Sequence, residues 1–165
     1  MKRIALLSDT HGYLDEKIFK YFDECDEIWH AGDIGSLEVI DRLEKIKPIK
    51  AVAGNVDDAT IRQFCPNSLR FMCEQTDVWI THIGGYPNCY SVPIRAEIYA
   101  NPPKLFICGH SHILKVMFDK KLNLLHINPG AAGNHGFHIV KTLVRFTIDG
   151  TVIKDLEVIE LGKRG

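Results

Sequence analysis

Residues 3–12, RIALLSDTHG, decide the fold, because a short apolar run stops abruptly at polar residues. Residues 3–7 are mostly apolar over a length typical of a buried strand. Asp9 and His11 follow at once, with Gly12 beside them. The stretch therefore predicts a strand whose carboxyl end carries groups able to bind a metal ion, and the same arrangement recurs along the chain.

The composition is that of an ordinary globular protein: 45% of the 165 residues are hydrophobic, 25% are charged and the net charge is −1. This length suits one hydrophobic core, so we expect a single domain over residues 1–165. No basic stripe points to a nucleic-acid partner. No apolar run approaches the roughly 20 residues of a membrane span, and residues 8–12 interrupt the first apolar stretch too early for a signal peptide. We therefore expect a cytoplasmic protein without a nucleic-acid or membrane partner.

The cysteines are scattered, and no two form a CxxC pair. They are Cys25, Cys65, Cys73, Cys89 and Cys108. An odd count without framework spacing argues against a disulfide scaffold and against a thiolate zinc site. We expect reduced and mostly buried thiols.

The first half of the chain alternates strand and helix. Strands are predicted at residues 3–7, 27–31 and 49–53, and helical spacing of apolar residues predicts helices over 14–25 and 36–46. Ser36 is a candidate N-cap for the second helix, and Pro48 ends it. Strands separated by helical crossovers pair in parallel and are buried on both faces.

The second half is richer in strands. Strands are predicted at residues 69–73, 78–81, 104–108, 115–119, 122–127, 138–148 and 152–159, with one helix over 92–99. Asp149-Gly150 is a strong signal for a two-residue hairpin turn. About ten strands are more than one flat sheet comfortably holds. The pattern therefore favours an α/β fold with two sheets packed face to face and helices outside.

Five short motifs each follow a predicted strand, and each offers an oxygen or imidazole ligand. They are Asp9-Thr10-His11-Gly12, Gly32-Asp33, Gly54-Asn55, Thr81-His82 and Gly109-His110-Ser111-His112. In open α/β sheets ligands bind outside the carboxyl ends of the strands, so the motifs should converge on one rim. A single motif of this kind is more often a polar loop than a metal site. Five in this order are a strong signal.

The spacing within the motifs also favours a metal centre. Asp9 and His11, like His110 and His112, are two residues apart, and such residues point to the same side of an extended chain. Four imidazoles, two carboxylates and one amide are too many ligands for one ion. They suit two ions that share a carboxylate, with Asp33 as the candidate bridge.

The ordered motifs SDTHG, GD, GN, TH and GHSH, with Asn128-Pro129-Gly130 after them, resemble the calcineurin-like metallophosphoesterases. The resemblance is to the small phosphodiesterases of the YfcE type, a branch that also resembles the retromer scaffold Vps29, and it covers nearly the whole chain. It implies a four-layer α/β/β/α sandwich of two mixed β-sheets flanked by helices, in agreement with the strand pattern.

The resemblance also implies a division of the ligands. Asp9, His11 and His112 would hold one metal ion, Asn55, His82 and His110 the other, and Asp33 would bridge. In this family a hydroxide between the ions attacks a small phosphodiester, with no covalent enzyme intermediate. Two ions about 3.5–4 Å apart clamp the attacking and leaving oxygens. With only nitrogen and oxygen ligands Mn²⁺ is favoured, and Ni, Fe, Co, Zn and Mg are the alternatives because the affinity order alone does not select.

The sequence departs from the family where a general acid is expected. Many relatives have His directly after the Asn, but here Val56 occupies that position and cannot donate a proton. Asp57 is a weak candidate acid, as is Asp58, although acidic residues at the start of a helix are the simpler interpretation. Ser36 and Ala131 stand where many relatives have Asp and Ser.

The remaining histidines have simpler interpretations. His30 and His126 lie in predicted strands and are expected to be structural, whereas His135 in a Gly-rich loop either contacts substrate or, as we favour, is solvated. Tyr86 belongs to a loop that could cover the site. The runner-up function is a non-catalytic Vps29-like scaffold, and the third is metal-dependent hydrolysis of a non-phosphate bond. The natural substrate and a homo-oligomeric state stay open.

Overall fold

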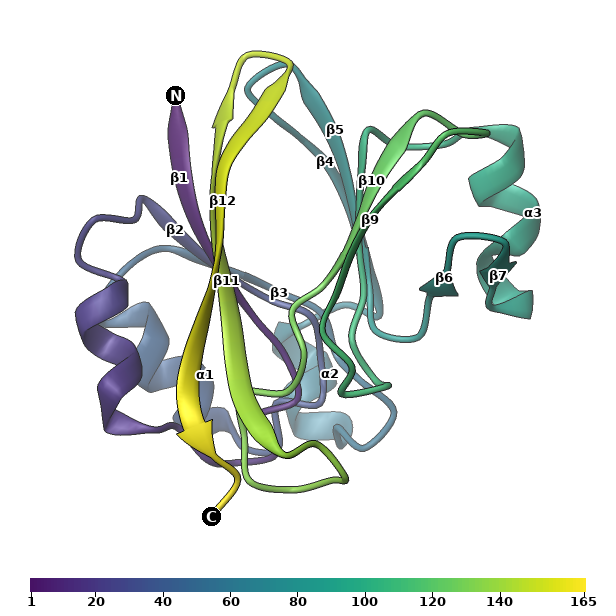
Figure 1. Ribbon diagram of the computed structural model, residues 1–165. Helices are drawn as coiled ribbons and strands as arrows, with labels where there is room; N and C mark the ends of the chain where they lie inside the picture. The colour runs from purple at the N-terminus through teal and green to yellow at the C-terminus, as the bar shows by residue number, and fades with distance from the viewer.

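Two mixed five-stranded sheets packed face to face form the protein, in a computed structural model that describes residues 1–165 (Figure 1). The first sheet has the order β12-β11-β1-β2-β3 and the second the order β4-β5-β8-β10-β9. Helices α1 (Leu37–Glu44) and α3 (Val92–Ala100) lie on opposite sides of the pair of sheets (Figure 1). The predicted four-layer α/β/β/α sandwich is confirmed.

The first sheet contains the parallel strands that the first half of the sequence predicts. Its strands are β1 (Lys2–Leu7), β2 (Glu27–His30), β3 (Ile49–Ala51), β11 (Val140–Asp149) and β12 (Val152–Lys163). β1 pairs in parallel with β2, and β2 with β3, while β11 runs antiparallel to both β1 and β12. β1 is therefore central, and its carboxyl end lies beside that of β2.

The second sheet is also mixed. Its strands are β4 (Ser68–Cys73), β5 (Thr76–Thr81), β8 (Leu105–Ile107), β9 (Lys115–Asp119) and β10 (Leu124–Asn128). β5, β8 and β10 are parallel to one another, whereas β4 and β9 are antiparallel edge strands. The carboxyl ends of β5 and β8 thus point the same way, which places the residues after them close together.

Three apolar layers hold the sandwich together, and strand alternation assigns residues to them. Ile4 and Leu6 of β1 lie between the sheets, in a cluster that includes Trp29 and Ile107. Neighbouring residues of β1 face the other way and pack beneath α1 and the segments around it. A third cluster, which includes Ile98 of α3, covers the outer face of the second sheet.

The helix predicted over residues 14–25 is wrong in extent and type. The structure has a short 3-10 helix, η1 (Glu16–Tyr21), with Asp15 as its N-cap. Apolar residues do face the core at helical spacing, since Leu14, Ile18 and Phe22 are all buried. The acidic residues at positions 23, 24 and 26 would oppose the dipole of a longer helix at its carboxyl end.

α2 (Ala59–Phe64) follows Asp58, whose side chain accepts from the Ile61 N–H as an N-cap, which confirms Asp58 as an acidic residue at the start of a helix. Two further short elements were not predicted. β6 (Gly85–Tyr86) and β7 (Cys89–Tyr90) form a small hairpin in the loop expected to lie near the site. Ser36 occupies the N-cap position of α1, as predicted, but its side chain makes no capping hydrogen bond. No helix of this fold has the length and apolarity to cross a membrane.

Candidate metal centre

The five motifs meet at one rim of the sandwich. Asp9, Asp33 and Asn55 follow β1, β2 and β3, while His82 follows β5 and His110 follows β8. Ligand atoms gather in two groups, each with all atoms within 4.8 Å of one another. The first group is Asp9, His11 and His112, and the second is Asp33, His82 and His110. The rim is therefore assembled from both sheets.

The backbone reaches this arrangement by a route that the spacing argument missed. We expected extended chain at the paired residues, but five of the seven candidate ligands have left-handed backbone. Their φ values are 54° for Asp9, 47° for His11, 55° for Asp33, 72° for His110 and 61° for His112. Left-handed backbone costs a non-glycine residue roughly 1–2 kcal/mol. Such strain persists where the surrounding structure imposes it, and it clusters at functional sites.

Backbone hydrogen bonds between the loops impose this conformation. The Asp9 N–H donates to the Gly32 carbonyl at 2.9 Å, and the His11 N–H donates to the Asp33 carbonyl at 3.0 Å. The Gly109 N–H donates in the same way to the His82 carbonyl at 2.9 Å, within the second sheet. Each loop is thus tied to the loop after the neighbouring strand, which fixes the ligands relative to one another.

Asp33 has the geometry expected of a shared ligand. Its Oδ2 lies 3.1 Å from His82 Nε2 and 3.6 Å from His11 Nε2, so one oxygen faces a histidine of each group. Its Oδ1 accepts from the Val56 N–H at 3.0 Å, which holds the carboxylate in place. Asp9 Oδ1 lies 3.7 Å from His82 Nε2 and so also faces a histidine of each group, and the bridging role of Asp33 stays a prediction.

Asp9 is completely buried, and its two oxygens have different surroundings. Oδ2 accepts from the Ser8 hydroxyl at 2.6 Å and from the His110 N–H at 3.1 Å. Oδ1 has no hydrogen-bond partner and lies 3.2 Å from His112 Nε2 and 3.8 Å from His11 Nε2. One oxygen positions the carboxylate and the other is left free toward the imidazoles.

The free polar atoms at the rim fit a bound cation. Asp9 Oδ1, His11 Nε2 and His82 Nε2 are buried and have no hydrogen-bond partner in the protein. An unsatisfied buried polar group costs about 1–3 kcal/mol. Lone pairs of carboxylate oxygen and imidazole nitrogen that face one another are the donor set of a transition-metal ion. The residues present therefore fit divalent metal.

The tautomer of His82 agrees with this role. Its Nδ1 lies 2.8 Å from the Ala31 carbonyl oxygen, so Nδ1–H donates there and the Nε2 lone pair faces Asp33. A backbone carbonyl that accepts from the other ring nitrogen commonly orients a metal-binding imidazole in this way. His110 Nδ1 lies 3.0 Å from Asn55 Oδ1, which joins the two exposed candidate ligands.

Protonation at the rim also favours a cation. Burial acts to raise the pKa values of Asp9 and Asp33, but the neighbouring histidines lower both overall, so the carboxylates are ionised at neutral pH. Burial lowers the pKa of His11. Burial also acts to lower the pKa of His82, yet the facing Asp33 and Asp9 carboxylates raise it overall. Deprotonated carboxylates and neutral imidazoles are the forms that bind metal. Asp9, Asp33 and His11 favour these forms, whereas at His82 a cation has to displace the proton that the two carboxylates favour.

Two glycines of the motifs have a steric role. A Cβ at Gly32 would overlap the His82 imidazole, and a Cβ at Gly54 would overlap the Asp33 carboxylate. These glycines therefore make room for the ligand side chains of neighbouring loops.

Asp57 is not placed to act as a general acid, and this prediction is corrected. Its carboxylate is buried and accepts from the backbone N–H groups of Ile34, Gly35 and Gly54 at 2.8–3.1 Å. A carboxylate that accepts three backbone N–H bonds acts as a structural link. It joins the loop that carries Asp33 to the loop that carries Asn55.

A cavity of about 270 Å³ opens over the candidate ligands. Besides ligands, its lining includes Val56, Ser111, His135 and Phe137. The His135 ring centroid lies 4.8 Å from that of His11, so His135 belongs to the cavity wall. His135 is also exposed, which agrees with the solvated loop residue that we favour. The other predicted structural histidines, His30 and His126, are buried as expected.

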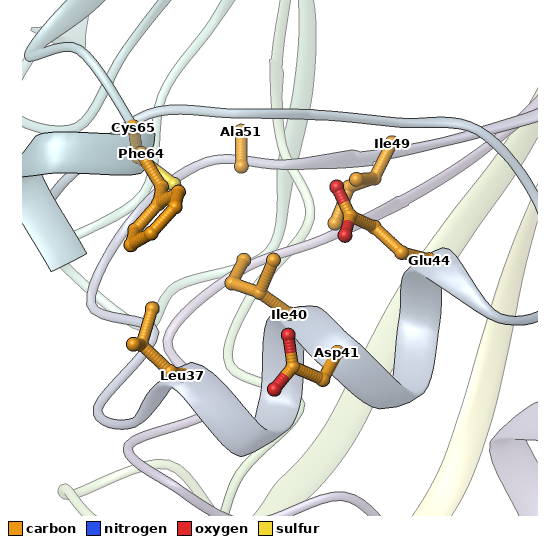
Figure 2. Close-up of a pocket in the computed structure, with 8 residues that line it drawn as sticks. All are labelled: Leu37, Ile40, Asp41, Glu44, Ile49, Ala51, Phe64 and Cys65. Atoms are coloured by element: carbon orange, nitrogen blue, oxygen red, sulfur yellow. The ribbon is translucent and has the colours of Figure 1, made fainter.

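A second cavity, of about 190 Å³, lies between α1, β3 and the end of α2 (Figure 2). Leu37, Ile40 and Phe64 point into it, and Asp41 and Glu44 are the only ionisable residues besides Cys65 in its lining. It has no group of metal ligands. The chemistry of the molecule is therefore concentrated at the strand ends.

Comparison with known proteins agrees with the geometry. A probable metallophosphoesterase of Methanothermobacter thermautotrophicus is 29% identical over 137 residues, which cover 78% of this chain and 76% of the relative. Among solved structures, a novel archaeal phosphodiesterase matches with a TM-score of 0.75 and 23% identity, covering 96% of this chain and 99% of that one. Vps29 of Chaetomium thermophilum matches with a TM-score of 0.75 and 14% identity, covering 99% and 100%.

The family itself follows from the sequence match. The model of the calcineurin-like phosphoesterase superfamily domain matches residues 1–151, which include all the candidate ligands. The two solved structures share the fold at identities too low to carry function. The chain belongs to the calcineurin-like phosphoesterase superfamily.

Proposed function

We propose that this protein is a phosphodiesterase that depends on two divalent metal ions and hydrolyses small phosphodiesters. The observation that carries the proposal is the set of buried, unpartnered atoms on Asp9, His11 and His82, which face one another at the rim. A protein that bound no cation there would retain an uncompensated cost at each atom. Family membership supports a phosphoester as the substrate class.

The proposed ligands divide as follows. Asp9, His11 and His112 would hold one ion, Asn55, His82 and His110 would hold the other, and Asp33 would be their shared ligand. When bound, the ions lower the pKa of attacking water and offset charge on the phosphoryl oxygens. Mn²⁺ is the proposed metal because the set offers only nitrogen and oxygen atoms, with Ni, Fe, Co, Zn and Mg as alternatives. Burial raises the pKa of the nearby Cys108 thiol to about 12, so it is no competing ligand.

The chain itself keeps the site ready for substrate. The Val56 N–H and the Ser8 hydroxyl fix the carboxylates of Asp33 and Asp9, and the Ala31 carbonyl orients His82. Ligands held in place before binding cost little reorganisation when charge develops. Val56 lines the cavity where many relatives carry a proton donor, so we propose a preference for diesters with good leaving groups.

A cytoplasmic location is part of the proposal. All five cysteines are free thiols, and four of them are buried. Free thiols in this number are typical of a reducing compartment.

The Vps29-like scaffold is the second candidate function, and the likeness of the fold supports it. A scaffold gains nothing from strained, partner-free ligands at a cavity. The left-handed backbone at five candidate ligands therefore favours the enzyme.

The test combines metal content with hydrolysis. Protein stripped with chelator and reloaded with Mn²⁺ should contain two ions per chain by elemental analysis. It should hydrolyse bis(p-nitrophenyl) phosphate faster than p-nitrophenyl phosphate, and the stripped protein should be inactive. Two bound ions without hydrolysis of any diester would favour the scaffold, and failure to bind metal would contradict the whole proposal.

A further inference from the structure

A small cavity next to the candidate metal centre is not used by the proposed hydrolysis. It has a volume of about 70 Å³, and its walls come from β6, β9, β10 and the loop after β8. The lining residues are Gly85, Tyr86, Ser111, Ile113, Lys115, His126 and Asn128. Ser111 lines both this cavity and the one over the candidate ligands, so the two cavities are neighbours.

Ser111 presents a free hydroxyl proton. Asn128 Nδ2 donates to Ser111 Oγ and to the Gly109 carbonyl, each at 3.0 Å, and Asn128 Oδ1 accepts from the Gly130 N–H. The Ile113 N–H also donates to Ser111 Oγ, at 3.2 Å. A hydroxyl oxygen has two lone pairs and one proton. Both lone pairs are occupied, so the proton is available to an external acceptor.

His126 supplies a second unpartnered group. It is 1% exposed, and its Nδ1 has no hydrogen-bond partner. Burial, followed by the positive charge of Lys115, lowers the pKa of His126 to about 4. The imidazole is therefore neutral at pH 7 and carries one N–H that can donate. A partner in the cavity would remove the cost of an unsatisfied buried nitrogen.

Lys115 supplies the charge. Its Nζ lies 4.3 Å from the centroid of the Tyr86 ring, which holds the side chain over the cavity, and it makes no ion pair. Asp119 is the acid on the same strand, but its carboxylate accepts from the Tyr90 hydroxyl and from the N–H groups of Lys121 and Leu122. The ammonium of Lys115 is thus left without a carboxylate partner.

We propose that this cavity binds a phosphate group. One cation and two free donors, with both lone pairs of Ser111 Oγ occupied and Asn128 Oδ1 accepting from the Gly130 N–H, suit an oxyanion and not a cation or an apolar group. Ser111 separates the cavity from the metal centre. The cavity would therefore receive a second phosphate, carried on the leaving group of a diester substrate (its leaving arm). This placement rests on the proposed function, whereas phosphate binding itself does not.

Binding is tested on metal-free protein, so that no metal ion competes for the anion. Inorganic phosphate should bind saturably in calorimetry, and Lys115→Met should weaken binding about tenfold or more because it removes a charge-assisted contact. Lys121→Met is the matched control, since it removes an exposed lysine near the same edge and should bind as the wild type. Equal affinity of Lys115→Met and wild type, or no binding at millimolar phosphate, would overturn the proposal.

A spectroscopic readout locates the ligand. In protein labelled with ¹⁵N at histidine, phosphate should shift the His126 ring resonances, which are assigned with His126→Gln. A response confined to His11, His82 or His112 would place the phosphate at the ligand cluster and reject the cavity. This measurement does not depend on activity, so its failure is distinct from failure of the proposed hydrolysis.

The source of the phosphate is tested with Mn²⁺-loaded enzyme. Diesters that differ only by a terminal phosphate on the leaving arm are compared by kcat/KM. Preference for the phosphorylated diester, lost in Lys115→Met and kept in Lys121→Met, supports the substrate role. Phosphate binding without that preference would overturn the substrate role and identify free phosphate as the ligand.

Discussion

The two groups of candidate ligands differ in their access to solvent. In the group of Asp9, His11 and His112, the carboxylate is completely buried and both imidazoles are partly covered. In the group of Asp33, His82 and His110, the first two are buried but His110 is exposed, as is Asn55 beside it. His11 and His112 line the same cavity as Asp33, Asn55 and His110, so the first group is closed only relative to the second, which we call the open group.

The difference follows from the position of the strands. β1 is the central strand of its sheet, and the 133–138 loop covers the residues after it, where the Gly133 N–H donates to the Asp9 carbonyl. β3 is an edge strand, so Asn55 after it has a neighbouring strand on one side only. We infer that the closed group retains its ion and that the open group exchanges its ion and receives substrate.

Asp33→Asn should have the largest effect, because it removes the charge that both groups share. We expect loss of both ions and a fall in hydrolysis of about 1,000-fold, since metal supplies most of the transition-state stabilisation. Elemental analysis and diester hydrolysis measure the two effects. Asp41→Asn, in the apolar cavity near α1, is the control, and an Asp33 variant that keeps two ions would contradict the shared role.

The two groups are compared directly with His112→Ala and His110→Ala. Each should weaken the binding of one ion by at least about 10- to 100-fold, the loss typical of removing a group that only supports a ligand. His112→Ala should reduce the occupancy of the tightly held ion. His110→Ala should leave that ion bound and release only the exchangeable one. Metal titration of each variant checks this, and identical titrations would show that the groups are not separate sites.

Stability should also depend on pH through His30, which contacts Thr10 between two ligands of the closed group. Its Nε2 lies 3.0 Å from Thr10 Oγ1, its Nδ1 accepts from the Gly32 N–H, and burial lowers its pKa from 6.5 to about 4. Below pH 6.5 the unfolded chain therefore binds a proton at His30, whereas the folded protein does not bind this proton until the pH approaches 4. Stability should be complete above pH 6.5 and fall by about 3 kcal/mol as the pH drops to about 4.

Urea unfolding of metal-free protein measures this loss, with His30→Gln for comparison. The variant should be less stable at pH 7, and its free energy of unfolding should change less between pH 6.5 and pH 4. The same dependence in both proteins would assign the loss to other groups.

The open group should depend on Asp57 for its support. Asp57→Ala leaves three backbone N–H groups without their carboxylate, so we expect a loss of about 2–3 kcal/mol of stability and weaker metal binding at the open group. Asp58→Ala removes only the N-cap of α2 and should cost about 1 kcal/mol with metal binding unchanged. Thermal unfolding and metal titration separate the two, and equal costs would argue against the linking role.

Val56→His should have the smallest effect. Val56 is 52% exposed and lines the cavity, so an imidazole there can reach a leaving group without disturbing the core. A positioned proton donor should raise kcat for diesters with poor leaving groups by about tenfold at least and change p-nitrophenyl substrates little. The ratio of the two rates is the measurement, and an unchanged ratio would contradict the missing-acid interpretation.

Much of the fold could be predicted because strands and turns leave local patterns. The apolar runs of the three parallel strands correspond to observed strands, and the hairpin predicted at Asp149-Gly150 is present with its turn one residue later, at Gly150-Thr151. The helix predicted over residues 14–25 is wrong because the spacing of apolar residues indicates which side chains face the core. It does not indicate how many helical turns the backbone forms. Asp57 was misjudged because a carboxylate's sequence position does not show which N–H groups surround it.

The sequence by itself determined which residues lie at the strand ends, since each candidate ligand directly follows an apolar run. The tertiary structure alone decided how they face one another, through left-handed backbone tied by hydrogen bonds between loops. It also decided that Lys115, His126 and Ser111 share a cavity, since they come from separate segments. Local chemistry can be inferred from neighbours in the chain, but the partners of a buried polar atom are set only when distant segments pack together.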